Sequence, residues 1–560
     1  MKHFLIVATS LLLLSVSASD SRLTGRQRAL HALNRLGFGA RPGDVDRVLK
    51  TGVDTWIDQQ LHPEVIPDRE LDARLQTIPT LKMSDAEMML KYYRPIVEAR
   101  RDRKNAKNDG QPDIKDKEAM QMLRKNAQQV TADLVSQRII RAAESDRQLN
   151  EVMVDFWFNH FNVFVGKGID RFLLTSYERD VIRPHIWGRF EDLLLATAKS
   201  PAMLFYLDNA RSVAEPANRP KMTQRPAGGF RGGMFGRRMP VDEDQMMRRR
   251  AQQQNANKNK GGLNENYARE IMELHTLGVD GGYTQKDVTE LARVFTGWTI
   301  APPQQGGGFI FRRALHDVGP KTVLGVHFPA GGGMEEGEKM IHILAHSPAT
   351  AHHIAYELAQ RLVADDPPKA LVDRVAKQFL DSDGDLRQTV KAVIDSPEFW
   401  DPQYYQAKVK SPFEYAISAV RAIDGQVTDA IPIARELQKI GEPLYGAQPP
   451  TGYSDKADVW VNTGALLNRL NFALALAANK MPGVRSDVVA LIPADAATDP
   501  HKSVDALALA LTGGDLSEAT RTTIRSRLVE RKAPAMDPWD NTQIPMIAGL
   551  ILGSPEFQKQ

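Results

Sequence analysis

The stretch Asn264-Glu-Asn-Tyr-Ala-Arg-Glu-Ile-Met-Glu-Leu-His-Thr-Leu-Gly278 reads as one complete helix, with a start signal and a stop signal. Asn264 is a favoured N-cap residue, and Gly278 is typical of the residue that ends a helix. Between them, Tyr267, Ile271 and Leu274 recur at helical spacing and form an apolar face. The stretch therefore predicts an amphipathic helix that packs against the rest of the protein.

Signals of the same kind recur along the chain and predict a mainly α protein. Ser is a good N-cap and Pro is favoured at the first helical position, so each Ser-Pro pair indicates a junction where one helix stops and the next begins. The five pairs are Ser200-Pro201, Ser347-Pro348, Ser396-Pro397, Ser411-Pro412 and Ser554-Pro555. Alternating strand patterns are scarce, and a short strand pair is indicated around Gly308 to Phe311 and Thr322 to Phe328. We expect a multi-helix globular array with at most a small β-hairpin and one long disordered insertion.

The composition excludes several classes of protein. The chain has 560 residues, with 72 Lys and Arg against 69 Asp and Glu, and this balance does not indicate nucleic acid or an anionic membrane as the main partner. The absence of cysteine excludes Cys nucleophiles, Cys-ligated zinc, iron–sulfur clusters and disulfides. The sequence has no Walker A loop, dinucleotide glycine fingerprint or Gly-x-Ser-x-Gly elbow, and it identifies no cofactor. Any chemistry must come from His, carboxylate, hydroxyl or amide groups.

The first 18 residues have the three-part pattern of a secretory signal peptide. Lys2 and His3 give a basic start, Phe4 to Val16 is an apolar run, and Val16-Ser17-Ala18 resembles a cleavage site. The alternative is an uncleaved anchor helix, although the apolar run is short for a membrane span. We therefore expect an exported protein, periplasmic or extracellular after cleavage, with no transmembrane segment in the mature chain.

A glycine- and arginine-rich segment interrupts the helical pattern. From Arg219 to Lys260 there are eleven basic and three acidic residues. Such a composition predicts disorder, because the segment cannot bury enough apolar surface to fold alone. Its Arg-Gly-Gly stretches can bind RNA, but for an exported protein a solvated insertion, or a loop attracted to anionic envelope polymers, is the better interpretation. With the insertion at 212–262, the remaining parts are an N-terminal helical part at 19–211, a central part at 263–480 and a C-terminal part at 481–560.

The segment from Met153 to Phe164 carries polar residues on an otherwise apolar helix. Asp155, Asn159 and Asn162 fall within about 60° of one another, and His160 lies among aromatic residues. A helix that is apolar nearly all round is buried, and buried polar groups need partners. Asp155, Asn159 and His160 therefore indicate either a catalytic site or a structural hydrogen-bond network between helices.

Two further groups are candidates for acid–base chemistry. In the helix quoted first, Glu270 lies on a polar face and His275 on the apolar face, about 140° apart on a regular helix. The segment lacks the His-Glu-x-x-His spacing of zincins, and a buried neutral His bonded to a carboxylate is the simpler interpretation. His316-Asp317 lies in a glycine-rich loop, where the pair could act as an oriented acid or base or only make a turn contact.

Glu338, His342 and His346 form a stripe with metal-ligand spacing. They stand at i, i+4 and i+8 on one face of a predicted helix, and His352-His353 follow soon after. Such geometry can hold zinc or a similar ion. The alternative is a partly exposed polar face before the Ser347-Pro348 junction.

Longer motifs run through most of the chain. They are His31-Ala-Leu-Asn-Arg-Leu-Gly-Phe-Gly-Ala-Arg-Pro-Gly43, Phe156-Trp-Phe-Asn-His-Phe161, Ser200-Pro-Ala-Met203 with Tyr206-Leu-Asp-Asn209, Asn264 to Trp298, His316-Asp317, Lys408-Val-Lys-Ser-Pro-Phe-Glu414, and Gly446 to Tyr453. Through them the chain resembles the bacterial domain-of-unknown-function 1800 family (DUF1800). The resemblance implies an exported, largely helical protein of unestablished activity, with a possible partner in another exported protein encoded nearby.

The same resemblance implies no established catalytic residue. The family pattern has positions that match Asn159, His160, Glu270, Glu273, His275, His316 and Asp317, and His342 departs from it.

Two functions are consistent with these observations. The first is an exported hydrolase or lyase on an envelope or extracellular polymer, with acid–base chemistry where the Asp155–His160 helix meets the Asn264–Gly278 helix and the His316-Asp317 loop. Its candidate catalytic residues are Asp155, Asn159, His160, Glu270, His275, His316 and Asp317. The alternative is a non-catalytic envelope assembly or binding protein, in which the buried polar residues are structural.

Overall fold

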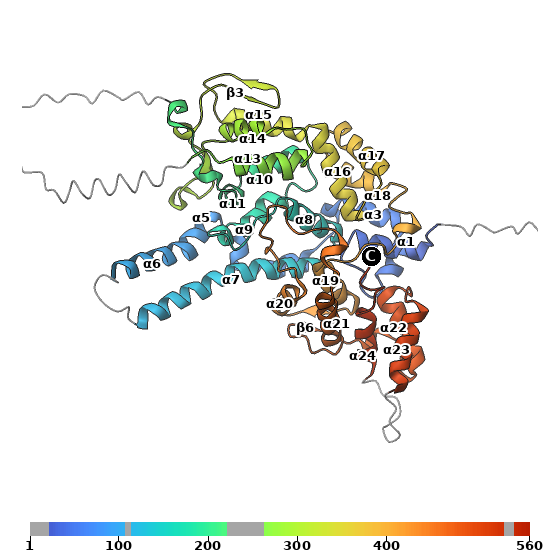
Figure 1. The fold of residues 1–560 in the computed structure, drawn as a ribbon. Coiled ribbons are helices and arrows are strands. Elements are labelled where there is room, and N and C mark those ends of the chain that lie inside the picture. The colour runs from blue at the N-terminus through green and yellow to red at the C-terminus, as the bar shows by residue number, and fades with distance from the viewer. Residues whose placement is uncertain (1–21, 107–113, 221–261, 531–542) are drawn as a thin grey trace, which may run out of the picture.

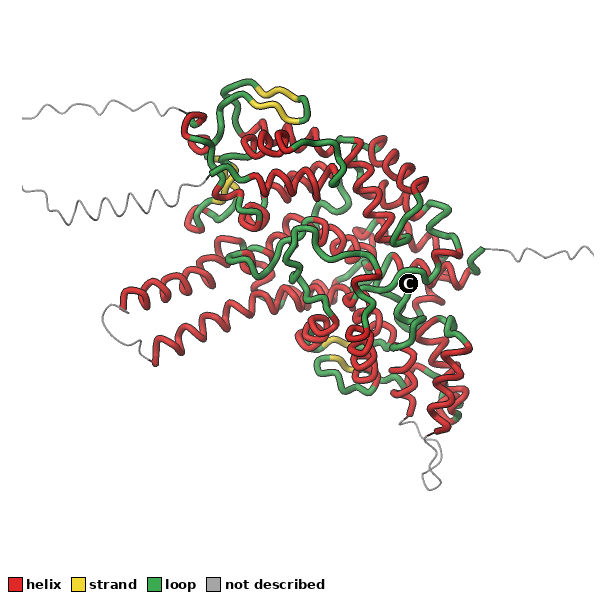
Figure 2. Tube along the Cα trace, in the orientation of Figure 1, coloured by secondary structure: helices red, strands yellow, loops and turns green. Residues whose placement is uncertain are grey.

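The computed structural model describes residues 22–106, 114–220, 262–530 and 543–560. The predicted signal peptide at 1–18, and residues 221–261 of the insertion predicted at 212–262, lie outside the described residues. Helices make up most of the regular structure, and the strands that are described form short two-stranded pairs (Figure 2). The predicted mainly α fold is confirmed.

The N-terminal part is arranged around the long helix α7 and the buried helix α8. Helices α6 and α7 run side by side as a hairpin that projects from the body (Figure 1). The elements of this part are α1 (Gly25–Arg35), α2 (Asp44–Thr51), α3 (Val53–Leu61), α4 (Arg69–Gln76), η2 (Pro79–Lys82), α5 (Asp85–Met88), η3 (Met89–Tyr93), α6 (Arg94–Ala106), α7 (Ile114–Glu144), α8 (Gln148–His160), η4 (Asp170–Phe172), α9 (Leu174–Ser176), η5 (Tyr177–Ile182), α10 (Phe190–Lys199) and α11 (Pro201–Tyr206).

The central part contains the helix predicted from Asn264 to Gly278, which changes character halfway along. It begins as α13 (Glu265–Met272) and continues as the π-helical turn η8 (Glu273–Leu277). Helix α16 packs against both α17 and η8. The other helices of this part are α14 (Gln285–Val294), α15 (Met334–Ala345), α16 (Pro348–Leu362), α17 (Lys369–Asp381) and α18 (Leu386–Ile394).

The helices from residue 412 onward, which span the end of the predicted central part and the predicted C-terminal part, pack back onto the body of the protein. Helices α21 and α24 pack against each other, and the backbone N–H of Gln560 donates to the carbonyl of Lys408 at 2.8 Å. The chain therefore ends close to α1 (Figure 1). The helices are α19 (Pro412–Ala422), α20 (Ile431–Ile440), α21 (Thr463–Ala477), α22 (Pro500–Thr512), α23 (Glu518–Glu530) and α24 (Ile544–Leu552).

Three of the five Ser-Pro pairs start helices as predicted. The Ser200, Ser347 and Ser411 side chains accept N-cap hydrogen bonds at the starts of α11, α16 and α19. Ser396 and Ser554 end helices but begin turns. There each hydroxyl accepts the backbone N–H three residues later, at 3.2 and 3.3 Å. The local hydrogen bond is thus the same, but no helix follows it.

The strands form where they were expected, but with different partners. Strand β2 (Phe309–Phe311) pairs with β1 (Trp298–Ile300), and β3 (Lys321–Val323) pairs with β4 (Val326–Phe328). Leu324 and Gly325 join β3 to β4 with positive φ angles of 49° and 77°. Such a two-residue turn favours a local hairpin over pairing with β2. A third pair joins β5 (Gln426–Val427) to β6 (Val484–Arg485).

One connected set of buried apolar side chains runs from Ala29 to Phe557 and joins the three parts of the chain. The two edges of the predicted insertion meet on this body, because the backbone N–H of Val213 donates to the carbonyl of Gly262 at 3.3 Å. Within the described residues, no helix has both the length and the apolar character needed to cross a membrane.

Candidate functional site

The predicted catalytic residues separate into several groups in the folded chain. His160 and His275 come together, with ring centroids 6.1 Å apart. Asp155 and Asn159 belong to a neighbouring polar network, and His316 and Asp317 belong to another beside the β-strands. Of these residues, only His160 belongs to a group of described side chains with metal-ligand geometry.

That group and the neighbouring His275 form a histidine cluster, defined here as His160, His275, His353 and Glu357. His160 ends α8, while His353 and Glu357 stand one turn apart on α16. Nδ1 of His160 lies 2.6 Å from Oε2 of Glu357, and Nε2 of His353 lies 3.6 Å from Oε1 of Glu357. One potential ligand atom from each of these three residues lies within 4.8 Å of the others.

The π-helical turn η8 positions both imidazoles of this group. Nε2 of His353 is 3.1 Å from the carbonyl oxygen of Leu274, and Nε2 of His160 is 3.3 Å from that of His275. Single π-helical turns occur frequently at functional sites. A backbone carbonyl that accepts an imidazole N–H fixes the orientation of the ring. In His160 the other nitrogen, Nδ1, faces Glu357, whereas in His353 the same Nε2 faces both the carbonyl and Glu357.

Gly278 ends this turn and is needed there for two reasons. Its φ is 80°, a left-handed value that favours glycine. A Cβ at this position would also lie 3.3 Å from Nδ1 of His353. The stop signal read from the sequence therefore also makes room for an imidazole of the cluster.

His275 is the most enclosed member of the cluster. It is buried, and its Nε2 has no hydrogen-bond partner among the described residues. Burial, followed by the proximity of His160 and His353, holds the pKa of His275 well below its usual value. The ring is therefore neutral at physiological pH, with a nitrogen available to accept a proton or a ligand.

Solvent reaches the cluster from α16. The side chain of Glu357 is 31% exposed and that of His353 is 22% exposed, whereas that of His160 is 2% exposed. Phe156, Trp157 and Phe161 enclose the His160 ring on the other side. Two imidazoles and a carboxylate suit Zn²⁺ and similar ions, and a catalytic zinc site keeps a further position open.

Asp155 is neutralised by two arginines from neighbouring helices. It accepts from Arg138 of α7, and from Arg361 of α16 at 3.2 Å. Arg361 also pairs with Glu414 at 2.9 Å and Asp455 at 3.0 Å. The side chains of Arg138 and Arg361 are 8% and 7% exposed. This network ties α7, α8, α16 and α19 together, which favours the structural interpretation of Asp155.

Asn159 and Asn162 hold the loop around residues 445–460 against α8. The amide of Asn159 donates to the carbonyl of Tyr453 and accepts from its backbone N–H, both at 2.7 Å. The amide of Asn162 donates to the carbonyls of Ala447 at 3.0 Å and Pro449 at 2.8 Å. Two of the three residues of the polar stripe predicted on this segment, Asn159 and Asn162, thus bind backbone groups of the loop.

His316 and Asp317 are buried in a separate network. His316 Nδ1 lies 2.8 Å from the carbonyl of Thr296, and its Nε2 lies 3.2 Å from Glu336. Arg293 donates two hydrogen bonds to Asp317, both at 3.0 Å. These contacts satisfy both side chains and stabilise the start of the loop that leads to β3.

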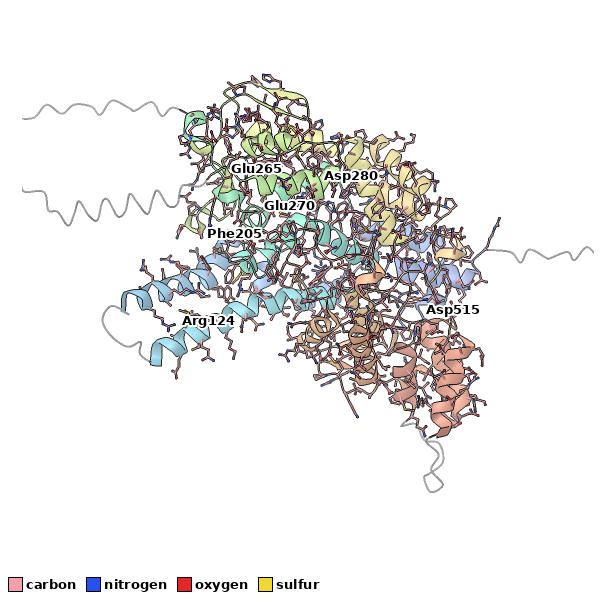
Figure 3. All side chains as sticks on the ribbon, viewed as in Figure 1. Arg124, Phe205, Glu265, Glu270, Asp280 and Asp515 are labelled. Atoms are coloured by element: carbon pink, nitrogen blue, oxygen red, sulfur yellow. The ribbon has the colours of Figure 1, made fainter. Side chains whose placement is uncertain are left out.

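Glu270 lies on α13, ahead of the π-helical turn (Figure 3). It is half-buried, and this partial burial and the neighbouring Glu273 raise its pKa above the usual value. Glu273 itself accepts a hydrogen bond from the Tyr283 hydroxyl at 2.8 Å. Glu270 is therefore an acid outside the histidine cluster.

The predicted stripe of Glu338, His342 and His346 is rearranged in the structure. Lys199 donates to Glu338 at 2.6 Å, and Glu191 of α10 takes the position beside the two histidines. Glu191 lies 3.0 Å from His342 and 3.8 Å from His346. The helix-face spacing identified the histidine pair, but the carboxylate beside it comes from a different helix.

Glu357 and the role of His353 were missed by the sequence reasoning. Both lie on α16, four residues apart, a spacing that puts two side chains on one face of a helix. That spacing is a usable signal. Their pairing with His160 is not visible locally, because 197 positions separate His160 from Glu357.

A family model described as "Protein of unknown function (DUF1800)" matches residues 31–559, nearly the whole chain. Comparisons with curated proteins and with solved structures gave no match. The matched region includes every group described above.

Proposed function

The chain belongs to the DUF1800 family, and from this premise we propose that it is an exported metalloenzyme, a hydrolase or lyase on an envelope or extracellular polymer. The observation that carries the proposal is the convergence of His160, His353 and Glu357 within ligand distance of one another. The three side chains come from two helices, and η8 orients both imidazoles. The unpartnered nitrogen of His275 lies beside them.

Each residue of the cluster has a separate role in this proposal. His160, His353 and Glu357 would hold a divalent transition ion such as Zn²⁺, which would supply an activated water at neutral pH when bound. The neutral imidazole of His275 would offer its unpartnered Nε2 for a hydrogen bond at the site. Phe156, Trp157 and Phe161 keep water from the buried side of the site.

The polymer substrate is supported by the sequence. The signal-peptide pattern at 1–18 supports a location outside the cytoplasmic membrane, where envelope polymers are available. The basic segment from Arg219 to Lys260 would attract anionic polymers to the body. The export of the protein, its location and its polymer substrate are all parts of what we propose.

The second candidate function is a non-catalytic envelope assembly or binding protein, which would act with a partner protein encoded nearby. Its support is the saturation of Asp155, Asn159, His316 and Asp317 by partners within the chain. In this alternative the histidine cluster is one more internal contact and holds no metal.

Metal binding separates the two functions. We would titrate Zn²⁺ into the purified chain by calorimetry. The His346→Ala substitution would be present in every protein tested, because it disrupts the His342–His346 pair at the end of α15, which could also bind Zn²⁺. One equivalent should bind, and His353→Asn should weaken binding at least tenfold. His352→Asn is the matched control, since its side chain neighbours His353 but is 53% exposed. Equal affinities in the two variants, or less than about 0.2 equivalents bound, would exclude the metal centre.

A further inference from the structure

A cavity with a volume of about 260 Å³ lies between α4, α7 and η5. It is separate from the histidine cluster. This is slightly below the roughly 300–1,000 Å³ of pockets for drug-sized ligands, so the cavity suits a small molecule. One side of the lining is apolar, with Leu75, Leu81 and Leu134. The rest of the lining is polar, with four cations (Lys82, Arg141, Arg179 and Arg183) against two carboxylates (Asp72 and Glu178), together with Gln76, Gln137 and Thr175.

Arg141 is a cation of this cavity without a close ion pair. Arg183 pairs with Glu178 at 2.7 Å and with Glu151 at 2.9 Å, so its charge is balanced. Nε of Arg141 donates to Gln137 at 3.0 Å, while the carboxylate of Asp72 is 4.0 Å away. Burial and the nearby Arg183 lower the pKa of Arg141, and they outweigh the neighbouring carboxylates, which raise it.

Thr175 gives a second, independent indication of a ligand. This residue is 3% exposed, and its hydroxyl has no hydrogen-bond partner among the described residues. Buried hydroxyl groups are normally paired, because leaving one unpaired costs free energy. A polar ligand group in the cavity would satisfy it.

We propose that this cavity binds a small organic carboxylate with an aliphatic body. A guanidinium binds a carboxylate with two parallel hydrogen bonds, which Arg141 can supply, and Thr175 can donate a further one. The three leucines would cover the aliphatic part of the ligand. A phosphate group would leave this apolar wall uncovered, and a neutral ligand would leave the charge of Arg141 unpaired.

The test is calorimetric titration of the full chain with sodium hexanoate at low salt. Hexanamide is the neutral counterpart of the same shape, and inorganic phosphate is the anion without an aliphatic body. Hexanoate should bind at least tenfold more tightly than either. Arg141→Met should weaken hexanoate binding at least tenfold, and Thr175→Val should weaken it about three- to tenfold.

Arg124→Met is the matched control. Arg124 is exposed on the same helix α7 (Figure 3), 17 residues from Arg141 and thus about 25 Å along the axis. Its substitution should leave hexanoate affinity unchanged, and circular dichroism checks that each variant folds. The proposal is overturned if hexanoate does not bind, if hexanamide or phosphate binds as tightly, or if Thr175→Val and Arg124→Met have equal affinity.

Discussion

Nδ1 of His160 lies 2.6 Å from Oε2 of Glu357, a contact that joins the end of α8 to the middle of α16. The imidazole is enclosed, with 2% of its side chain exposed, whereas 31% of the carboxylate side chain remains exposed. A cation that enters from solvent therefore meets Glu357 before it meets His160. This order makes Glu357 the residue at which metal binding is most directly tested.

Zn²⁺ should raise the melting temperature of the native chain but not that of Glu357→Gln. A ligand that binds only the folded state, at a hundred times its Kd, stabilises that state by about 2.7 kcal/mol. The glutamine keeps the shape of the side chain but loses the charge that attracts the ion. Differential scanning fluorimetry with and without Zn²⁺ measures both shifts, again in the His346→Ala background. Equal shifts in the two proteins would remove Glu357 from the site.

Asn159→Ala should destabilise the fold without changing metal affinity. The substitution removes two hydrogen bonds to the backbone of Tyr453 and leaves that backbone unpaired, at a cost of about 1–3 kcal/mol. Urea denaturation measures the loss, and limited proteolysis should show faster cleavage near residues 445–460. If Zn²⁺ affinity fell while stability stayed unchanged, Asn159 would belong to the site and not to the loop.

Local signals in the sequence predicted local structure well. Asn264 caps α13, and Ser200, Ser347 and Ser411 cap α11, α16 and α19, because these bonds span only a few residues. The β2 and β3 stretches were found for the same reason. Their partners were not, because pairing depends on the turn at Leu324 and Gly325.

The sequence predicted some residues of the candidate site but not their partners. Placing Glu270 and His275 about 140° apart assumed a regular helix, but the chain changes to a π-helical turn at Glu273. That change supplies the carbonyls that hold His160 and His353. The partners of Asp155 come from α7 and α16, and no spacing within α8 indicates them. Contacts between helices that are far apart in the sequence determine which polar residues are paired within the fold.

Asp170→Asn should stabilise the protein, and more so at alkaline pH. Asp170 is fully buried, neither carboxylate oxygen has a hydrogen-bond partner among the described residues, and burial raises its pKa to about 9. In the unfolded chain the pKa of an aspartate is near 3.9. Because the folded state keeps the proton to a higher pH, the stabilisation that comes from protonated Asp170 is complete below about pH 4 and is lost as the pH rises to about 9.

At pH 8 the free energy of unfolding of Asp170→Asn should therefore exceed that of the native chain by about 1–3 kcal/mol, and the difference should be smaller at pH 5. Urea denaturation at both pH values gives the two differences. Asp46→Asn, at a side chain that is 76% exposed, should show no such pH dependence. A pH-independent effect of Asp170→Asn would mean that the carboxyl is not protonated in the folded state.

Replacing residues 221–261 with a short glycine–serine linker should leave the fold intact but weaken binding to anionic polymers. Val213 contacts Gly262, and the chain from residue 213 to 220 reaches at most about 25 Å when fully extended, so a linker of about ten residues is expected to suffice. The replacement removes ten basic and three acidic residues and changes the formal net charge from +3 to −4. Retention on an anionic polysaccharide column at low salt should fall, and the melting temperature should stay within about 2 °C. Unchanged retention would show that the body, and not this segment, makes the contact.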